Sequence, residues 1–199
     1  MNRRKLLMTA LGAAALTVAG TAPAWAKLFY DPNTNSWVDR TVGPSNGRPG
    51  HYTPIPRETV DYDGKFKSGT IIVETEERRL YFVLGGGQAI RYGIGVGRDG
   101  FRWAGQHAIT RKAEWPGWTP PAEMRKRVPD LPAYMPGGPD NPLGARALYI
   151  GATLYRLHGT SEPWTIGQAV SSGCIRLTNE DIIDLYDRAK VGALVVVHQ

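Results

Sequence analysis

The chain has almost no cysteine, because Cys174 is the only one among its 199 residues. A single thiol can form neither an intramolecular disulfide nor a cysteine-based zinc cluster. The four histidines are scattered along the sequence, without the close pairing that a histidine-rich metal site shows. A disulfide scaffold and a cysteine- or histidine-rich metal centre are therefore excluded as starting hypotheses.

The sequence also lacks any dense tract of Lys and Arg interleaved with aromatic residues, the usual pattern of a nucleic-acid-binding surface. The formal net charge is +6, and the first 26 residues hold three Lys and Arg and no Asp or Glu. Without that segment the net charge falls to +3, with 21 Lys and Arg against 18 Asp and Glu. We therefore expect no nucleic-acid partner.

A long hydrophobic run is missing as well, and the apolar stretch from Leu6 to Val18 is short for a membrane span of about 20 residues. It follows the positive residues 3–5 and precedes Ala24-Trp-Ala26, an A-x-A cleavage site. Residues 1–26 are thus predicted to be an export signal removed after Ala26, which places the mature protein in the periplasm. The adjacent arginines resemble a twin-arginine signal, and Sec export remains an alternative.

Residues 27–66 are polar and rich in Pro and Gly, and we interpret them as an extension with little core of its own. Residues 67–199 have the texture of a globular domain. Gly and Pro together supply 39 of 199 residues, which disfavours an all-helical bundle. Residues 101–146 are interpreted as a long functional loop that walls a cleft. Runs rich in β-branched and aromatic residues predict strands at 70–75, 79–84, 89–96, 147–150, 154–157 and 193–198.

One helix is predicted, from Thr178 to Lys190, with Thr178 as its cap and Gly192 ending it. Its apolar residues recur at the spacing of a single buried face. The expected fold class is therefore mostly β, a sandwich-like or mixed sheet, with one C-terminal helix packed on it.

The chemistry is predicted to centre on Cys174 and His158. Cys174 lies in Ser171-Ser-Gly-Cys-Ile-Arg-Leu177, just before the capped helix, and His158 ends a predicted strand. A thiol has a pKa of about 8.5, so it needs a base to become a nucleophile. An imidazole can take that proton and later protonate a departing amine. The arrangement suits an exported cysteine acyltransferase, with the backbone N–H groups of Ser172, Gly173 and Cys174 as an oxyanion hole.

The plainer alternative is that each residue is structural, since a lone Cys is commonly a small buried hydrophobe. Three observations favour chemistry. Cys174 lies between turn-forming residues, it comes just before a helix N-terminus that favours a thiolate, and it is the sole thiol of a chain predicted to enter an oxidising compartment.

At these residues the sequence resembles the YkuD-type L,D-transpeptidases. The resemblance extends over residues 67–199, and the spacing of its two central motifs makes a chance match improbable. The segments that carry it are His158-Gly-Thr160, Ser171-Ser-Gly-Cys-Ile-Arg-Leu177, Asn179-Glu-Asp181, Val191-Gly192, Tyr92–Gly97 and Asn141-Pro-Leu-Gly-Ala145.

The resemblance implies the YkuD-type catalytic fold and an enzyme that acts on peptidoglycan stem peptides. Cys174 would attack the carbonyl of the third residue of a tetrapeptide stem and release D-Ala. The acyl group would pass to an amine of another stem (a 3→3 crosslink), of a D-amino acid, or of a lysine in an outer-membrane lipoprotein or barrel protein. His158 would be base and then acid, with its ring oriented by the Gly159 carbonyl. Carbapenem-type β-lactams would acylate Cys174, and no metal or organic cofactor would be needed.

Three further residues are expected to contact substrate: Arg176, Ser171 and Trp164. Arg176 would pair with a stem carboxylate at the pocket edge, or alternatively form a structural ion pair with Glu180 or Asp181. Trp164 lies between His158 and Cys174 in sequence, although core packing is as plausible for any one tryptophan. Many relatives have a histidine where this chain has Ser172, which puts a second imidazole role in doubt.

Two other functions remain open from sequence. With water as the acceptor, the protein would be an L,D-carboxypeptidase or endopeptidase. A non-catalytic wall-binding module with an inert, buried thiol is the alternative from another class.

Overall fold

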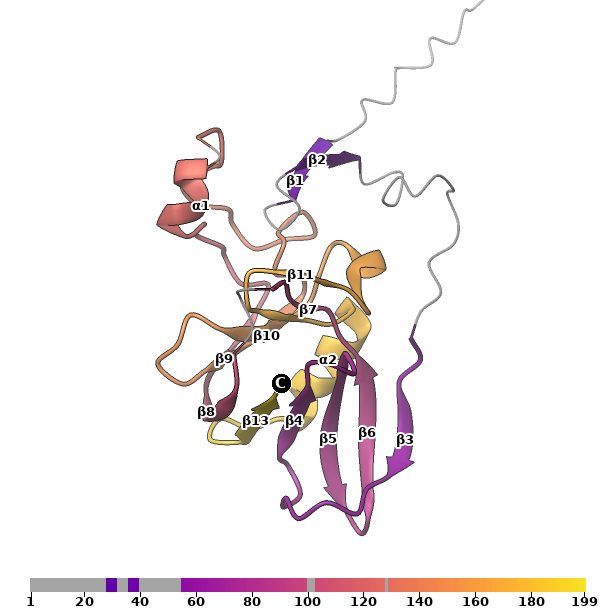
Figure 1. The fold of residues 1–199 in the computed structure, drawn as a ribbon. Helices are drawn as coiled ribbons and strands as arrows, with labels where there is room; N and C mark the ends of the chain where they lie inside the picture. The colour runs from indigo at the N-terminus through magenta and orange to yellow at the C-terminus, as the bar shows by residue number, and fades with distance from the viewer. Residues whose placement is uncertain (1–27, 32–35, 40–54, 100–102, 128) are drawn as a thin grey trace, which may run out of the picture.

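A computed structural model describes residues 28–31, 36–39, 55–99, 103–127 and 129–199 of the chain (Figure 1). The predicted export signal, residues 1–26, lies outside these ranges. The predicted extension, residues 27–66, is described only in part.

Within the described residues, nine strands form one mixed sheet in the order β12-β10-β9-β8-β13-β4-β5-β6-β3. Two of its pairings are parallel, β13 with β4 and β10 with β12, and the other pairings are antiparallel. The strands are β3 (Glu58–Asp61), β4 (Ile71–Glu74), β5 (Arg79–Gly85), β6 (Gln88–Gly93), β8 (Gly105–Glu114), β9 (Arg146–Ile150), β10 (Arg156–His158), β12 (Ile175–Arg176) and β13 (Leu194–His198).

Shorter elements surround this sheet. Two pairs of strands lie outside it, β1 with β2 antiparallel and β7 with β11 parallel. These elements are β1 (Leu28–Asp31), β2 (Ser36–Asp39), β7 (Val96–Gly97), β11 (Ala169–Ser171), the helices α1 (Ala122–Arg127) and α2 (Asn179–Arg188), and the 3₁₀ helix η1 (Pro163–Thr165). No helix in the described ranges combines the length and apolar character needed to span a membrane.

The predicted fold class is confirmed, because strands dominate and α2 packs against β9 of the sheet (Figure 1). The apolar runs of β4, β5 and β6 form the expected antiparallel meander. Their buried side chains join those of β9, β13 and α2 in one core. Burial of such side chains contributes about 25 cal/mol per Å² of apolar surface, so this shared core holds the sheet and the helix together.

Helix α2 follows its sequence signals closely. The Thr178 hydroxyl accepts a hydrogen bond from the N–H of Asp181 at 3.1 Å, which caps the first turn. Ile182 and Leu185 are fully buried, so one apolar face meets the core. At the other end, the Lys112 ammonium of β8 donates to the Ala189 carbonyl at 2.8 Å and complements the negative end of the helix dipole.

The interpretation of residues 101–146 as a long loop is wrong, because β8 occupies ten of them. The strand pairs with β13 on one side and β9 on the other, which places it near the middle of the sheet. Most of its side chains are exposed or half-buried, and only Ile109 is buried. The strand thus lacks the apolar alternation by which sequence patterns reveal a strand, and backbone pairing with its neighbours determines its conformation.

The extension also contributes more than expected, because β3 is the outermost strand of the main sheet. It pairs with β6 through the register Glu58↔Arg91 to Asp61↔Gln88. Its four side chains are exposed or half-buried, which is why its composition is that of a loop. The boundary between extension and domain therefore lies before residue 58.

Candidate active site

The parallel pairing of β10 with β12 brings together the two motifs that the sequence analysis emphasised. In this register Leu157 is opposite Ile175, and His158 is opposite Arg176. Cys174 comes directly before β12, two residues from Arg176. Neighbouring strands lie about 4.8 Å apart, so residues sixteen positions apart in sequence are placed on adjacent backbones.

His158 is buried and its ring is held in one orientation. The ring Nδ1 lies 2.6 Å from the carbonyl oxygen of Gly159, and a carbonyl oxygen can only accept a hydrogen bond. Nδ1 therefore carries the proton, and Nε2 of the neutral ring is left as a proton acceptor. This is the contact that the sequence analysis expected between Gly159 and the imidazole.

The environment of His158 strongly favours the neutral ring. Burial, together with the positive charges of Arg176 and Arg156, lowers the pKa of His158 from 6.5 to about 3. The carbonyls of Gly159 and Leu143 act in the opposite direction and do not outweigh these effects. At neutral pH the imidazole ring of His158 is therefore uncharged.

Cys174 is partly exposed and follows a turn that favours glycine. Gly173 has φ +100°, in the region where other residues are strained. The Cys174 thiol lies 3.9 Å from the carbonyl oxygen of Leu154, a weak S–H···O contact. The turn between β11 and β12 therefore presents the sulfur at the surface while its neighbours are buried.

Ser171 is buried and shapes this turn, so its hydroxyl is not positioned to bind substrate as expected. Its Oγ accepts a hydrogen bond from the Gly173 N–H at 3.1 Å and donates one to the carbonyl of Cys174. The Gly173 N–H, one of three expected oxyanion donors, is thereby engaged. The N–H groups of Ser172 and Cys174 donate no hydrogen bond to any residue that the structure describes. The Ser172 hydroxyl is buried and has no partner within the described ranges.

Arg176 is buried and forms a structural ion pair, the alternative to a substrate contact, with Glu162 where the sequence analysis named Glu180 or Asp181. Its side chain is only 3% exposed, and its guanidinium forms an ion pair with the buried Glu162 at 3.4 Å. It also donates to the hydroxyl of Thr165 at 3.3 Å. The partner lies in the segment between β10 and η1, which sequence spacing cannot reveal. Arg176 thus joins this segment to β12 and adds positive potential beside His158.

Replacing Arg176 with Met is expected to lower the free energy of unfolding by about 3–5 kcal/mol, because it breaks the buried ion pair with Glu162 by removing one of its two charges. Adding Glu162→Leu should restore a large part of this loss. Urea unfolding of both variants measures the effect. Unchanged stability together with a raised KM would instead assign Arg176 to substrate binding.

Two tryptophans are relevant to the site. Trp164 lies in η1 and is half-buried, and its contact with substrate stays a prediction. Trp103, which had no assigned role, donates from its indole Nε1 to the Gly173 carbonyl at 2.8 Å. It stacks on Tyr155, with ring centroids 4.6 Å apart, and meets the edge of His107 at 5.7 Å. No local sequence pattern identifies Trp103 or Tyr155, because their contacts near Cys174 join segments that lie far apart in the sequence.

The segment Asn141-Pro-Leu-Gly-Ala145 packs against the backbone of Gly159, the residue that follows His158. Asn179, the first residue of α2, accepts a hydrogen bond from the Ala145 N–H at 2.9 Å. A Cβ at Gly144, whose φ is +63°, would lie 2.6 Å from the carbonyl carbon of Gly159. This close approach requires a glycine at 144, and it fixes the backbone that carries the Gly159 carbonyl.

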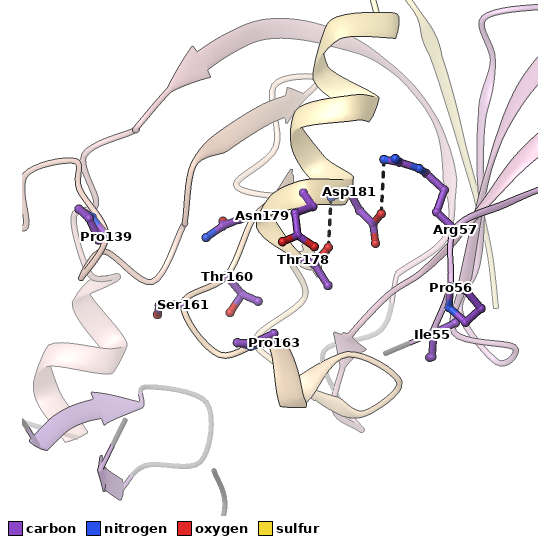
Figure 2. A pocket seen from close by; sticks show the side chains of 11 residues that line it. Ile55, Pro56, Arg57, Pro139, Thr160, Ser161, Pro163, Thr178, Asn179 and Asp181 are labelled. Atoms are coloured by element: carbon purple, nitrogen blue, oxygen red, sulfur yellow. Dashed lines mark hydrogen bonds and ion pairs between the residues drawn. The ribbon is translucent and has the colours of Figure 1, made fainter. Parts of the chain in front are cut away.

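A pocket of about 670 Å³ opens beside this segment (Figure 2). It lies between the loop that follows Gly159 and the first turn of α2, and Pro139 is the residue of the 101–146 segment that lines it. Figure 2 shows Arg57 reaching across to Asp181, an ion pair of 3.6 Å. Neither Cys174 nor His158 is among its lining residues, which are Ile55, Pro56, Arg57, Pro139, Thr160, Ser161, Pro163, Thr178, Asn179, Glu180 and Asp181.

The pairing of β10 with β12 gathers a thiol and an imidazole. In the parts of the chain that the structure covers, no three His, Cys, Asp or Glu side chains cluster as a metal site would require. A thiol, a neutral imidazole of fixed tautomer and backbone N–H groups together can support acyl transfer.

Comparison with known proteins points to one family. The family model described as the L,D-transpeptidase catalytic domain, YkuD, matches residues 68–197. The probable L,D-transpeptidase ErfK/SrfK of Escherichia coli is 40% identical over 155 residues, 74% of this chain and 49% of the relative. The probable L,D-transpeptidase YbiS of the same organism is 42% identical over 149 residues, 71% of this chain and 47% of the relative. The chain thus spans about half the length of these curated relatives.

The fold has solved counterparts as well. The catalytic domain of an E. faecium L,D-transpeptidase, determined in a form acylated by ertapenem, superimposes with a TM-score of 0.52. The match covers 68% of this chain and 100% of that domain at 19% identity, a likeness in fold.

Proposed function

The chain belongs to the YkuD family of L,D-transpeptidases, and we propose that it transfers peptidoglycan stem peptides through a thioester on Cys174. The donor is a tetrapeptide stem, and the reaction releases its terminal D-Ala. The acceptor is an amine, supplied by another stem, by a D-amino acid or by a lysine of an outer-membrane protein. The periplasm is the proposed site of action, on the basis of the export signal predicted in residues 1–26.

The proposed reaction has two steps that share one base. Nε2 of His158 accepts the Cys174 proton as the sulfur attacks the carbonyl carbon, and the carbonyl electrons move onto the oxygen. When the tetrahedral intermediate collapses, the C–N bond breaks and His158 returns the proton to the departing D-Ala amine. His158 next removes a proton from the acceptor amine, whose nitrogen attacks the thioester carbonyl. The C–S bond then breaks, and His158 returns the proton to the sulfur, which restores the thiol.

The tautomer of His158 is the observation that carries this proposal. With Nδ1 donating to the Gly159 carbonyl at 2.6 Å, Nε2 is the nitrogen available to the chemistry. The lowered pKa of His158 keeps that nitrogen unprotonated at the pH of the reaction. The pairing of β10 with β12 places this ring on the strand beside the one that follows the partly exposed thiol of Cys174.

The nature of the acceptor can be tested with purified disaccharide-tetrapeptide stems, alone and with added glycine or a D-amino acid. We expect mass spectrometry to show loss of D-Ala together with an equal amount of amine-exchanged or crosslinked product. Tripeptide as the main product in the presence of amine would instead identify a carboxypeptidase. No change in the stems would favour the wall-binding alternative.

A carbapenem provides a second test of the same proposal. The E. faecium catalytic domain is known in a form acylated by ertapenem, and we propose that Cys174 reacts in the same way. The adduct would appear in the intact mass and on the peptide that contains Cys174.

A further inference from the structure

The turn that carries Cys174 is held from outside by one indole. We propose that Trp103 is a positioning residue, which aims the Cys174 N–H at the oxygen that becomes negative during acyl transfer. This inference rests on the proposed function. It starts from the hydrogen bond of 2.8 Å between Trp103 Nε1 and the Gly173 carbonyl.

Through the geometry of the peptide bond, this hydrogen bond also fixes the direction of the Cys174 N–H. The Gly173 carbonyl and the Cys174 N–H belong to the same planar unit, and in a trans peptide the two groups point in opposite directions. No cis peptide bond is found in the described residues. When the indole holds the carbonyl on one side, it therefore directs the Cys174 N–H to the other side.

The other peptide units of the turn are already fixed by Ser171. Its hydroxyl accepts from the Gly173 N–H and donates to the Cys174 carbonyl. The Cys174 N–H is left without an acceptor within the described part of the chain. A donor that is fixed in direction and unsatisfied at rest is what stabilisation of an oxyanion needs, because no reorganisation is required during the reaction.

Trp103 is itself held firmly enough to act as an anchor. One face of its ring stacks on Tyr155 with an interplanar angle of 3°, and its edge meets His107 of β8 at an angle of 64°. Tyr155 directly follows Leu154, whose carbonyl oxygen lies 3.9 Å from the Cys174 sulfur. The indole thus connects the turn that carries Cys174 to the segment before β10 and to β8.

The role can be separated from general support by comparing two reactions of the same thiol. Attack on p-nitrophenyl acetate forms an S–C bond, moves the carbonyl electrons onto oxygen and expels p-nitrophenolate, so it uses an oxyanion donor. Alkylation by iodoacetamide displaces iodide at a saturated carbon and generates no oxyanion. Trp103→Phe removes the N–H and retains a ring against Tyr155, and 3-benzothienylalanine at position 103 replaces the N–H with sulfur at nearly the same shape.

We expect both variants to acylate at least about tenfold more slowly with p-nitrophenyl acetate, since loss of one donor costs about 10²–10³ in kcat and misorientation costs less. Alkylation by iodoacetamide should change less than about twofold, and kcat on stems should fall with little change in KM. The matched control is Trp115→Phe, at the opposite end of β8, where the indole is 42% exposed and should affect neither reaction.

Equal slowing of both reactions, or of neither, would overturn the role of Trp103. A wild-type protein that acylates no faster than a free thiol would also overturn it, because no oxyanion donor would then be at work. By contrast, normal acylation by the ester without any turnover of stems would contradict the proposed function alone.

Discussion

Cys174→Ala is expected to abolish turnover of tetrapeptide stems and acylation by a carbapenem, while the fold persists. The side chain is partly exposed and makes only a weak contact with Leu154, so its loss removes little packing. Removal of a catalytic nucleophile typically costs on the order of 10⁶ in kcat, which would place the variant below detection. Product analysis by mass spectrometry and thermal unfolding of the same sample measure activity and folding separately.

Cys174→Ser is the matched control for this prediction. It retains a hydroxyl of similar size, but a hydroxyl is a far weaker nucleophile than a thiol next to a neutral base. Its activity should be severely reduced and its unfolding midpoint unchanged. Stem turnover by the Ala variant at the wild-type rate would refute nucleophilic catalysis by Cys174.

His158→Gln is expected to have the second largest effect, a fall of about 10²–10⁴ in the rate of acylation, because the general base is lost. Gln is similar in size and neutral, so it should fill the buried site without introducing a charge. In the wild type, the acid limb of kcat/KM should lie below pH 6.5, since burial and the nearby arginines lower the pKa of His158 to about 3. An acid limb at or above pH 6.5 that disappears in the variant would contradict the neutral-base assignment.

The same pKa shift makes stability depend on pH. Between pH 3 and 6.5 the unfolded chain binds a proton on His158 that the folded chain does not bind. The free energy of unfolding therefore rises with pH across this window. As the solution is acidified from pH 6.5 towards pH 3, the folded protein loses this contribution to its stability. Urea unfolding at several pH values should show a shallower dependence for His158→Gln than for the wild type.

Short sequence patterns were sufficient to predict the helix cap, the apolar strands and the fold class. Thr178 as a helix cap, the apolar runs of the meander and the mostly β fold with one packed helix all follow from short stretches of sequence. The catalytic roles of Cys174 and His158 remain predictions, although the parallel pairing of their strands is consistent with them.

Features that depend on partners from distant strands could not be predicted. Strand β8 has few buried side chains, so only its pairing with β13 and β9 identifies it. The sequence shows that Arg176 is charged, but it does not identify its buried partner, Glu162, which lies fourteen residues away on another segment. The hydrogen bond from Trp103 to the Gly173 carbonyl spans 70 residues and leaves no local pattern.

Strand β3 has a consequence for where the functional unit begins. The family match starts at residue 68, after this strand, yet β3 pairs with β6 through the register Glu58↔Arg91 to Asp61↔Gln88. A protein truncated at residue 68 would keep the pairing of β6 with β5 but expose the other edge of β6, an open edge of the kind through which sheets join one another and aggregate. It would also lose the ion pairs that Arg57 forms with Asp181 and Asp184 at α2. We therefore expect the stable catalytic domain to begin before β3, ahead of the first residue that the family model matches.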